Sequence, residues 1–146
     1  MTSSRRTFLA ASAASAGALA LSSCATTKSR AARSLDSKLA LMVVGVAGRG
    51  ADNLHGVAGE DVVILCDVDG RNLEAAGKRF PKARLVADYR AILNDPAETG
   101  KLDGVVISTP DHTHYLPAML ALRQNLDVYC EKPLVQTVAQ ARRLLQ

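Results

Sequence analysis

Asp61-Val-Val-Ile-Leu-Cys66 (DVVILC) is the stretch that decides the fold. After its first residue it is apolar throughout and rich in branched side chains, which favours a strand with both faces buried. Strands of this kind belong to parallel sheets that helices cover on both sides. The sequence around it should therefore alternate strands with helices.

The chain from Leu39 onward shows this alternation. Apolar runs predict strands over Leu39–Val46, Asp61–Cys66, Arg84–Val86, Asp103–Ser108 and Leu126–Cys130. Amphipathic stretches predict helices over Ala51–Ala58, Asn72–Phe80, Tyr89–Asn94 and His112–Gln124, and a last helix from Thr137. Asp111 is expected to cap the fourth helix. The pattern predicts an α/β fold, a doubly wound parallel sheet with strand order 3-2-1-4-5.

This strand order separates two cysteines. Cys66 and Cys130 end strands that lie three spacings apart, or ~14 Å at ~4.8 Å per spacing. Because a disulfide needs its two Cα atoms much closer than this, we expect both thiols to stay free.

Residues 1–24 have the features of an export signal. Arg5 and Arg6 precede Phe8-Leu9 and a run of small and apolar residues that is too short to span a membrane comfortably. The paired arginines resemble a twin-arginine (Tat) signal, which the Tat export machinery reads. The small residues before Cys24 resemble a lipobox, whose cysteine is acylated. The alternatives are a buried alanine-rich helix and a chance cysteine.

Residues 25–38 are polar, basic and rich in small side chains, which predicts a flexible linker to a folded domain over 39–146. The expected location is the periplasm, either free or membrane-anchored as a lipoprotein through a lipid on Cys24.

Net charge does not indicate a nucleic-acid partner. Six of the 18 basic residues and one of the 14 acidic residues precede Leu39, so the folded part is close to neutral. It contains no basic patch with interleaved aromatic residues, and nucleic-acid binding is therefore not expected.

A glycine-rich segment, VGVAGRG, follows the first predicted strand. A diphosphate needs backbone N–H groups at a helix N-terminus and no side chain that blocks its approach. Read as G-x-G-x-x-G, the key positions are Gly45, Ala47 and Gly50, so alanine replaces the middle glycine. Gly48 offers freedom for the turn to shift, and Arg49 offers a cation beside the phosphates. The alternative is a turn that only packs a helix against a strand.

Asp67 directly follows the second predicted strand. It lies 22 residues after Gly45, close to the ~20 expected for the acid that accepts the ribose hydroxyls of a dinucleotide. Because a carboxylate repels a 2′-phosphate, NAD is favoured over NADP, with Arg71 as a competing ligand for that phosphate. We expect Asp69 to cap the next helix.

The segment STPDHTH follows the fourth predicted strand at the same edge of the sheet. Thr109 and Pro110 end the strand and direct the chain across the cofactor, and Asp111 is counted with them as a cofactor contact. His114 is expected to line the cofactor pocket. With His112 it forms a poor metal pair, because no third ligand lies nearby, and no metal is expected.

Glu131, Lys132 and Pro133 leave the fifth predicted strand at this edge. A lysine here would lie beside the nicotinamide and hydrogen-bond a substrate hydroxyl as its proton leaves. Pro133 fixes the backbone that carries Lys132, and Glu131 is counted as a cofactor contact. The alternative is a surface ion pair between Glu131 and Lys132.

Four segments (GVAGRG, ILCDVD, VVISTPDHTH and DVYCEKPL) occur in this order, and together they resemble the N-terminal half of the Gfo/Idh/MocA oxidoreductases. The resemblance implies a Rossmann domain that binds NAD, and hydride transfer from a CH–OH group of a sugar or polyol. It implies that Lys132 is the catalytic lysine of an E-K-P motif, that Asp67 binds the ribose, and that His114 lies beside the cofactor. A cis bond before Pro133 is also expected.

The family pattern continues into a sixth strand and a second α/β domain that binds the sugar, whereas Gln146 falls within the last predicted helix. The resemblance therefore implies a chain truncated before the substrate domain, with a sheet incomplete at its C-terminal edge. Such a chain is expected to bind NAD weakly and to be inactive alone. The alternatives are an NAD-dependent glycosidase of the same superfamily and a non-catalytic, lipid-anchored nucleotide-binding module.

Overall fold

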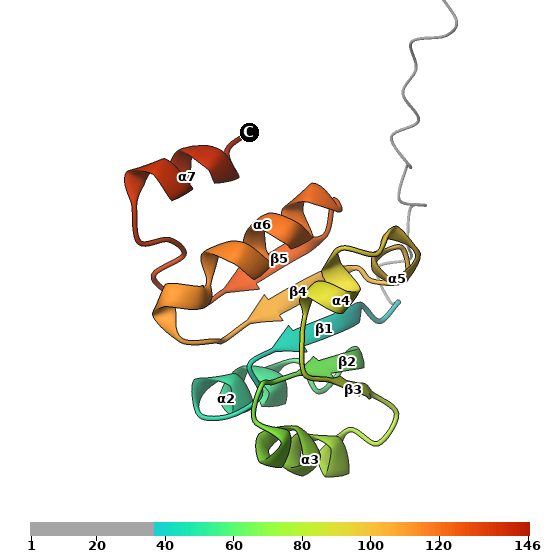
Figure 1. Cartoon of the computed structure of the whole chain (residues 1–146). Coiled ribbons are helices and arrows are strands. Elements are labelled where there is room, and N and C mark those ends of the chain that lie inside the picture. The colour runs from blue at the N-terminus through green and yellow to red at the C-terminus, as the bar shows by residue number, and fades with distance from the viewer. Residues whose placement is uncertain (1–36) are drawn as a thin grey trace, which may run out of the picture. The chain divides into compact units, whose positions relative to one another are not determined.

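A five-stranded parallel sheet organises residues 37–146, the part of the chain that the computed structural model describes (Figure 1). Its strands are β1 (Ala40–Val44), β2 (Asp61–Cys66), β3 (Arg84–Val86), β4 (Gly104–Ile107) and β5 (Asp127–Cys130). They lie in the order β3-β2-β1-β4-β5, and every neighbouring pair is parallel. The predicted fold class and strand order are confirmed.

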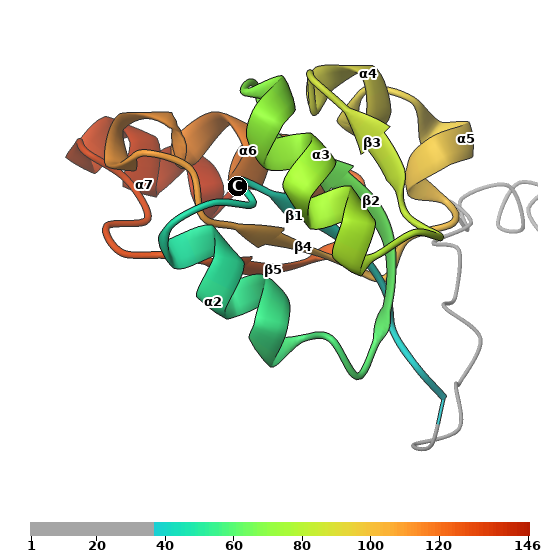
Figure 2. The same cartoon turned by 90° about the horizontal axis from the view of Figure 1, so that it is seen from below.

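Helices cover both faces of this sheet. They are α2 (Arg49–Gly56), α3 (Gly70–Arg79), α4 (Arg90–Leu93), α5 (Pro96–Thr99), the 3₁₀ turn η1 (Asp111–Thr113), α6 (Tyr115–Arg123) and α7 (Val138–Leu144). Helices α2 and α3 pack on one face, as seen in Figure 2, while α4 and α6 pack on the other.

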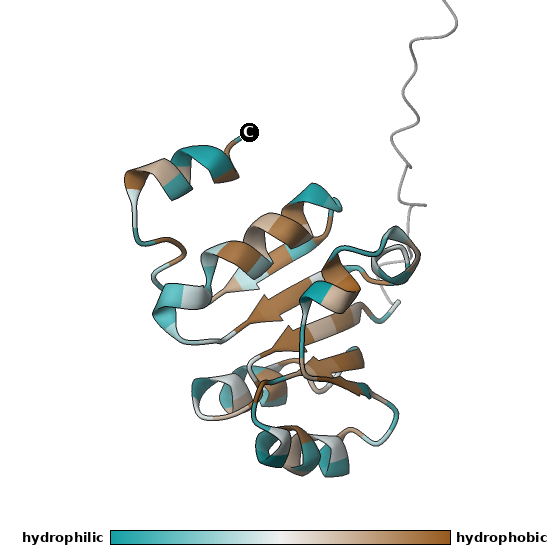
Figure 3. Ribbon diagram, viewed as in Figure 1, coloured by the Kyte–Doolittle hydropathy of each residue, from teal (hydrophilic) through white to brown (hydrophobic). Residues whose placement is uncertain are grey.

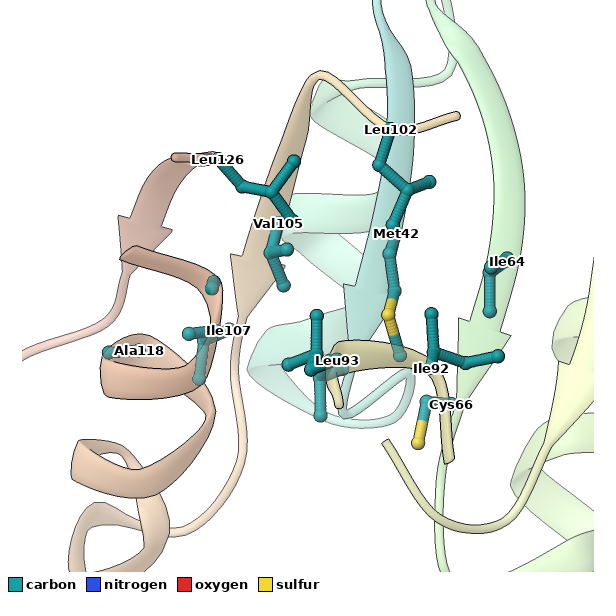
Figure 4. Packing of buried hydrophobic residues seen from close by; sticks show 12 residues of the cluster. Met42, Ile64, Cys66, Ile92, Leu93, Leu102, Val105, Ile107, Ala118 and Leu126 are labelled. Carbon is teal, nitrogen blue, oxygen red and sulfur yellow. The ribbon is translucent and has the colours of Figure 1, made fainter. Parts of the chain in front are cut away.

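Successive residues of the central strand enter different cores. Met42 and Val44 belong to the core under α4 and α6, whereas Val43 belongs to the core under α2 and α3. Figure 3 shows β1, β2 and β4 as largely apolar, and Figure 4 shows Met42 packed among residues of the first core. The unbroken apolar character of these strands follows from burial on both sides.

Helix α6 begins later than predicted. It starts at Tyr115 and not at His112, and Asp111 lies in η1 and does not cap it. The reason is Pro117, which has no N–H to donate and is tolerated only in the first turn of a helix. The helix therefore begins just before this proline.

A short helix was missed by the sequence patterns. In α5, the Asp95 carboxylate accepts a hydrogen bond of 2.8 Å from the backbone N–H of Ala97, and Pro96 is the first helical residue. Both features are known helix-start signals. The prediction read Asp95-Pro96 only as the end of the preceding helix.

The two cysteines of the sheet are free, as expected. Burial raises the pKa of the Cys66 thiol to about 12 and that of the Cys130 thiol to about 11. Both side chains therefore remain neutral thiols at physiological pH and pack as small apolar groups.

The predicted signal peptide, its paired arginines, Cys24 and almost all of the predicted linker lie outside the described residues. Within residues 37–146, no helix is both long and apolar enough to cross a membrane.

Candidate functional site

The carboxyl ends of the strands meet at one edge of the sheet, where the arrowheads of β1, β2 and β4 point in Figure 1. Backbone hydrogen bonds tie the loops that leave this edge to one another. The N–H of Gly45 donates to Cys66 O (2.8 Å), that of Ser108 to Val44 O (2.8 Å), and that of Glu131 to Ile107 O (3.0 Å). Segments distant in the sequence are therefore held side by side.

A cleft of about 850 Å³ opens between the loops that follow β1, β2, β3 and β4. Four of the predicted site residues line it: Gly45, Asp67, Thr109 and Pro110. The cleft is thus located at the switch point of the doubly wound sheet, where such folds bind their ligands.

In the glycine loop, the backbone lies close to the backbone of other segments. A Cβ on Gly45, whose φ is 85°, would lie 2.7 Å from Ser108 O, and one on Gly50 would lie 2.1 Å from Gly45 O. Gly48 precedes α2 with a φ of 53°, a left-handed conformation that favours glycine. Ala47 is exposed and lines the cleft. The glycines therefore fix the close approach of two loops, and the methyl of Ala47 faces the side from which a ligand enters.

Asp67 connects two of these loops. Its Oδ2 accepts from the backbone N–H of Val46 (3.0 Å), and its Oδ1 accepts from that of Asp69 (2.9 Å). Each carboxylate oxygen has a second lone pair, so Asp67 can still accept hydroxyl hydrogen bonds from a ligand in the cleft. Asp69 caps α3 as predicted, through the N–H of Arg71.

The hydroxyl of Thr109 lacks a partner among the described residues, although it is buried. A buried polar atom without a hydrogen bond is unfavourable by ~1–3 kcal/mol, and in native proteins such an atom is rare and calls for an explanation such as a functional role or a bound water or ion. Because Thr109 also lines the cleft, this unused hydroxyl fits a polar ligand such as a dinucleotide.

Glu131, like Asp67, connects segments that are distant in the sequence, but it lies outside the cleft lining. Its Oε1 accepts from Asn53 Nδ2 (2.8 Å), Arg49 Nε (3.1 Å) and the Tyr129 hydroxyl (3.3 Å). Asn53 Nδ2 also donates to Ser108 Oγ at 2.8 Å. Hydrogen bonds from Asn53 and Arg49 hold the pKa of the Glu131 carboxyl below its ordinary value. Helix α2 and the loops after β4 and β5 are thereby joined.

This geometry bears on the sequence expectations for Glu131 and Arg49. Within residues 37–146, Glu131 forms its ion pair with Arg49 and not with Lys132, so the alternative of a Glu131–Lys132 pair is wrong. The guanidinium of Arg49 is directed to Glu131 and Asp52, and Arg49 does not line the cleft. Its contact with phosphates remains a prediction.

Lys132 lies at the same edge of the sheet as Gly45 and Asp67, because β5 runs parallel to β4 and β1. Its side chain is exposed. The peptide bond between Lys132 and Pro133 is cis, as expected. The structure therefore brings the catalytic candidate to the predicted edge, just beyond the residues that line the cleft.

His114 is located differently from the expectation. Its side chain is buried, with 1% of its surface exposed, and it is not part of the cleft lining. Nδ1 lies 2.8 Å from Pro133 O and Nε2 lies 2.7 Å from Thr109 O. His112, the other histidine of this segment, lines the cleft. Asp111 is exposed beside it and does not line the cleft.

Sequence patterns missed several residues of the site. Asp88, Tyr89 and Arg90 follow β3 and line the cleft. Arg90 forms a 2.8 Å ion pair with Asp88, much as Arg71 does with Asp69. The only available signal was their position after a strand at the same edge.

The strand order and the cleft at the switch point define a dinucleotide-binding α/β domain. A family profile described as an oxidoreductase family with an NAD-binding Rossmann fold (Gfo/Idh/MocA) matches residues 39–146. This chain belongs to that family, and the matched residues form an NAD-binding Rossmann domain.

Individual relatives agree with this assignment. The chain is 29% identical over 115 residues to inositol 2-dehydrogenase of Acidothermus cellulolyticus, a match that covers 76% of this chain and 33% of the relative. It is 34% identical over 106 residues to D-apiose dehydrogenase of Paraburkholderia graminis, covering 70% and 27%. The chain thus spans about a third of the length of the curated relatives it matches.

A solved structure shows the same fold with the cofactor bound. The crystal structure of GenD2 from gentamicin A biosynthesis, in complex with NAD, is 26% identical and superposes with a TM-score of 0.65. The match covers 77% of this chain and 32% of that one.

Proposed function

We propose that this chain provides the NAD-binding part of an oxidoreductase that oxidises CH–OH groups of sugars or polyols. The observation that carries the proposal is that Gly45, Asp67 and Lys132, far apart in the sequence, share one edge of the sheet beside a cleft. NAD, when bound, supplies the acceptor for the hydride.

The residues of the cleft suit the two polar parts of this cofactor. Gly45 and Gly50 allow a close backbone approach, and the N-terminus of α2 favours negative charge, as a diphosphate needs. Asp67 holds oxygen lone pairs for ribose hydroxyls, while its charge opposes a 2′-phosphate. The unpaired hydroxyl of Thr109 gains a partner when the cleft is filled.

Lys132 is the residue proposed to act on the substrate. An ammonium group donates hydrogen bonds only, so it binds the oxygen of a substrate hydroxyl and stabilises the negative charge that develops there as the hydroxyl proton passes to water and the hydride passes to NAD. Its exposure leaves it accessible to a substrate. The names of the relatives, an inositol dehydrogenase and an apiose dehydrogenase, support a sugar or polyol as that substrate.

Chemical modification of lysines tests the position of Lys132 next to the cofactor. The full chain is treated with an amine-acetylating reagent with and without saturating NAD, and each lysine is quantified by mass spectrometry. Lys132 should be modified several-fold more slowly with NAD, whereas Lys78 and Lys101, exposed and distant from the cleft lining, should not change. Equal modification of Lys132 in both samples contradicts the proposal.

Whether the chain catalyses the reaction by itself is tested separately from the position of Lys132. We expect the 146-residue chain to reduce no NAD when it is given inositol, because it matches only about a third of the length of the inositol 2-dehydrogenase to which it is similar. Sustained NADH formation that disappears in Lys132→Met contradicts this expectation and leaves the assignment of Lys132 intact.

We also propose that the chain is exported by the twin-arginine route and lipidated at Cys24. Support comes from Arg5-Arg6 before the apolar run and from the small residues before Cys24. This route carries folded proteins, so NAD bound in the cytoplasm can travel with the domain. The double variant Arg5→Lys with Arg6→Lys should accumulate in the cytoplasm, and normal export of that variant contradicts the proposal.

A further inference from the structure

His114 joins the two loops on either side of the proposed reaction centre. Its imidazole lies between Thr109 O, in the loop after β4, and Pro133 O, in the loop after β5, at 2.7 and 2.8 Å. These carbonyls come from residues 24 positions apart in the sequence. One buried ring thus spans the gap between the two segments.

Both neighbours of the ring are acceptors, which restricts its chemistry. A carbonyl oxygen only accepts, so each contact is a hydrogen bond only if the facing ring nitrogen carries a proton. A neutral imidazole holds one loop, and a ring protonated at both nitrogens holds both. Both ring nitrogens face backbone carbonyls in either case, so neither is directed toward a ligand in the cleft.

The loop after β5 is held on both sides of Lys132. On one side, the Glu131 carboxylate binds Asn53 and Arg49 of α2 at 2.8 and 3.1 Å. On the other side, the carbonyl of Pro133 binds His114. The side chain of Lys132 is exposed between them. The surroundings therefore constrain the backbone of Lys132 and leave its amine accessible.

We propose that His114 is a positioning residue, which holds the backbone that carries Lys132 against the loop of Thr109. This inference rests on the proposed role of Lys132, and it replaces the expected direct contact between His114 and the cofactor. It predicts that loss of the ring donors loosens both loops while the rest of the sheet is unaffected.

Hydrogen exchange of the full chain without NAD tests the proposal. Thr113 and Glu131 have backbone N–H bonds of 2.8 and 3.0 Å within these loops, which make their exchange measurable. In His114→Phe, which keeps a ring but has no donor, peptides over 109–114 and 131–136 should exchange roughly tenfold faster, the effect of about one lost hydrogen bond. A peptide over β2 (Asp61–Cys66) should keep its exchange rate.

Two further variants keep the test decisive. His114→Gln retains an amide donor and should restore part of the protection, and it carries the test if His114→Phe does not fold. His55→Gln, at an exposed position on α2 outside the cleft, should exchange like the original chain. Unchanged exchange in both loops of a folded His114 variant, or equal acceleration of β2, overturns the proposal.

The lysine modification experiment separates this inference from the proposed function. If Lys132 is placed by His114, then His114→Phe should lose most of the protection that NAD gives to Lys132, and His114→Gln should recover part of it. Full protection in His114→Phe overturns the positioning role. If NAD protects Lys132 in no variant, the proposed function fails, while exchange measured without NAD still decides the role of His114.

Discussion

The two halves of the functional edge are built by different means. On the β1–β2 side, the glycines allow main-chain segments to lie close together, and the Asp67 carboxylate accepts hydrogen bonds from backbone N–H groups. On the β4–β5 side, the side chains of Asn53, Glu131 and His114 add further contacts to the backbone hydrogen bonds of the loops.

This difference has consequences for mutation. The backbone approaches at Gly45 and Gly50 leave no room for an added side chain, so a larger residue at either position should affect the fold itself. A side-chain network loses one hydrogen bond at a time, and each is worth ~0.5–1.5 kcal/mol, or more when one partner is charged. We therefore expect large, structural effects where these two glycines are replaced and graded effects where a single hydrogen-bonding side chain is changed.

The largest effect is expected for Gly50→Ala. The new methyl would lie 2.1 Å from Gly45 O, a backbone atom that cannot move away without displacing the loop. The free energy of unfolding should fall by about 3 kcal/mol or more, as measured by urea denaturation.

Gly56→Ala is the matched control, because Gly56 also belongs to α2 but faces open space. It should stabilise the domain by about 0.5–1 kcal/mol. Similar stabilities for the two variants would remove the steric argument for the glycine loop.

Asp67→Asn should weaken NAD binding by roughly tenfold to a hundredfold, because hydrogen bonds to a charged acceptor contribute ~1.5–3 kcal/mol. Isothermal titration calorimetry of the full chain measures the change. Asp61→Asn, at the opposite end of β2 and exposed, is the control and should bind NAD normally. Equal affinities in all three proteins would show that Asp67 does not contact the cofactor.

Asp69→Asn should raise affinity for NADP by about fivefold. The change removes the charge that holds Arg71 in a 2.8 Å ion pair, so the guanidinium becomes available to a 2′-phosphate. Asparagine still caps α3, so the helix should remain intact. Adding Arg71→Gln should abolish the gain in a calorimetric titration with NADP, and a gain that persists without Arg71 would refute this explanation.

Glu131→Gln should give the smallest effect and alter how stability depends on pH. The folded-state pKa of Glu131 is lowered from 4.5, chiefly by its hydrogen bonds with Asn53 and Arg49. A lowered carboxyl pKa contributes stability above the unfolded pKa, and this is lost as pH falls through the folded value. Urea midpoints between about pH 6 and about pH 3 should therefore decline less steeply in the variant. Parallel curves would indicate that the network does not favour the charged carboxylate.

The same difference between the two sides of the edge explains which site residues could be predicted from the sequence. On the β1–β2 side, the glycine spacing and Asp67 are local signals tied to strand ends, and the structure locates them as expected. On the β4–β5 side, the hydrogen bond between Asn53 and Glu131 joins residues 78 positions apart, which no local pattern reveals. His114 could be predicted as a residue of the site. The direction of its side chain depends on where α6 begins, and Pro117 determines that the helix begins at Tyr115.

The most direct test of the account is an amide NMR titration of the full chain with NAD. We predict saturable shifts that appear together in the loops of Gly45, Asp67, Thr109 and Lys132, with one dissociation constant for all four. Shifts confined to the opposite edge of the sheet, around Asp61 and Asp127, or shifts in the glycine loop that leave Lys132 unchanged at saturation, would contradict it.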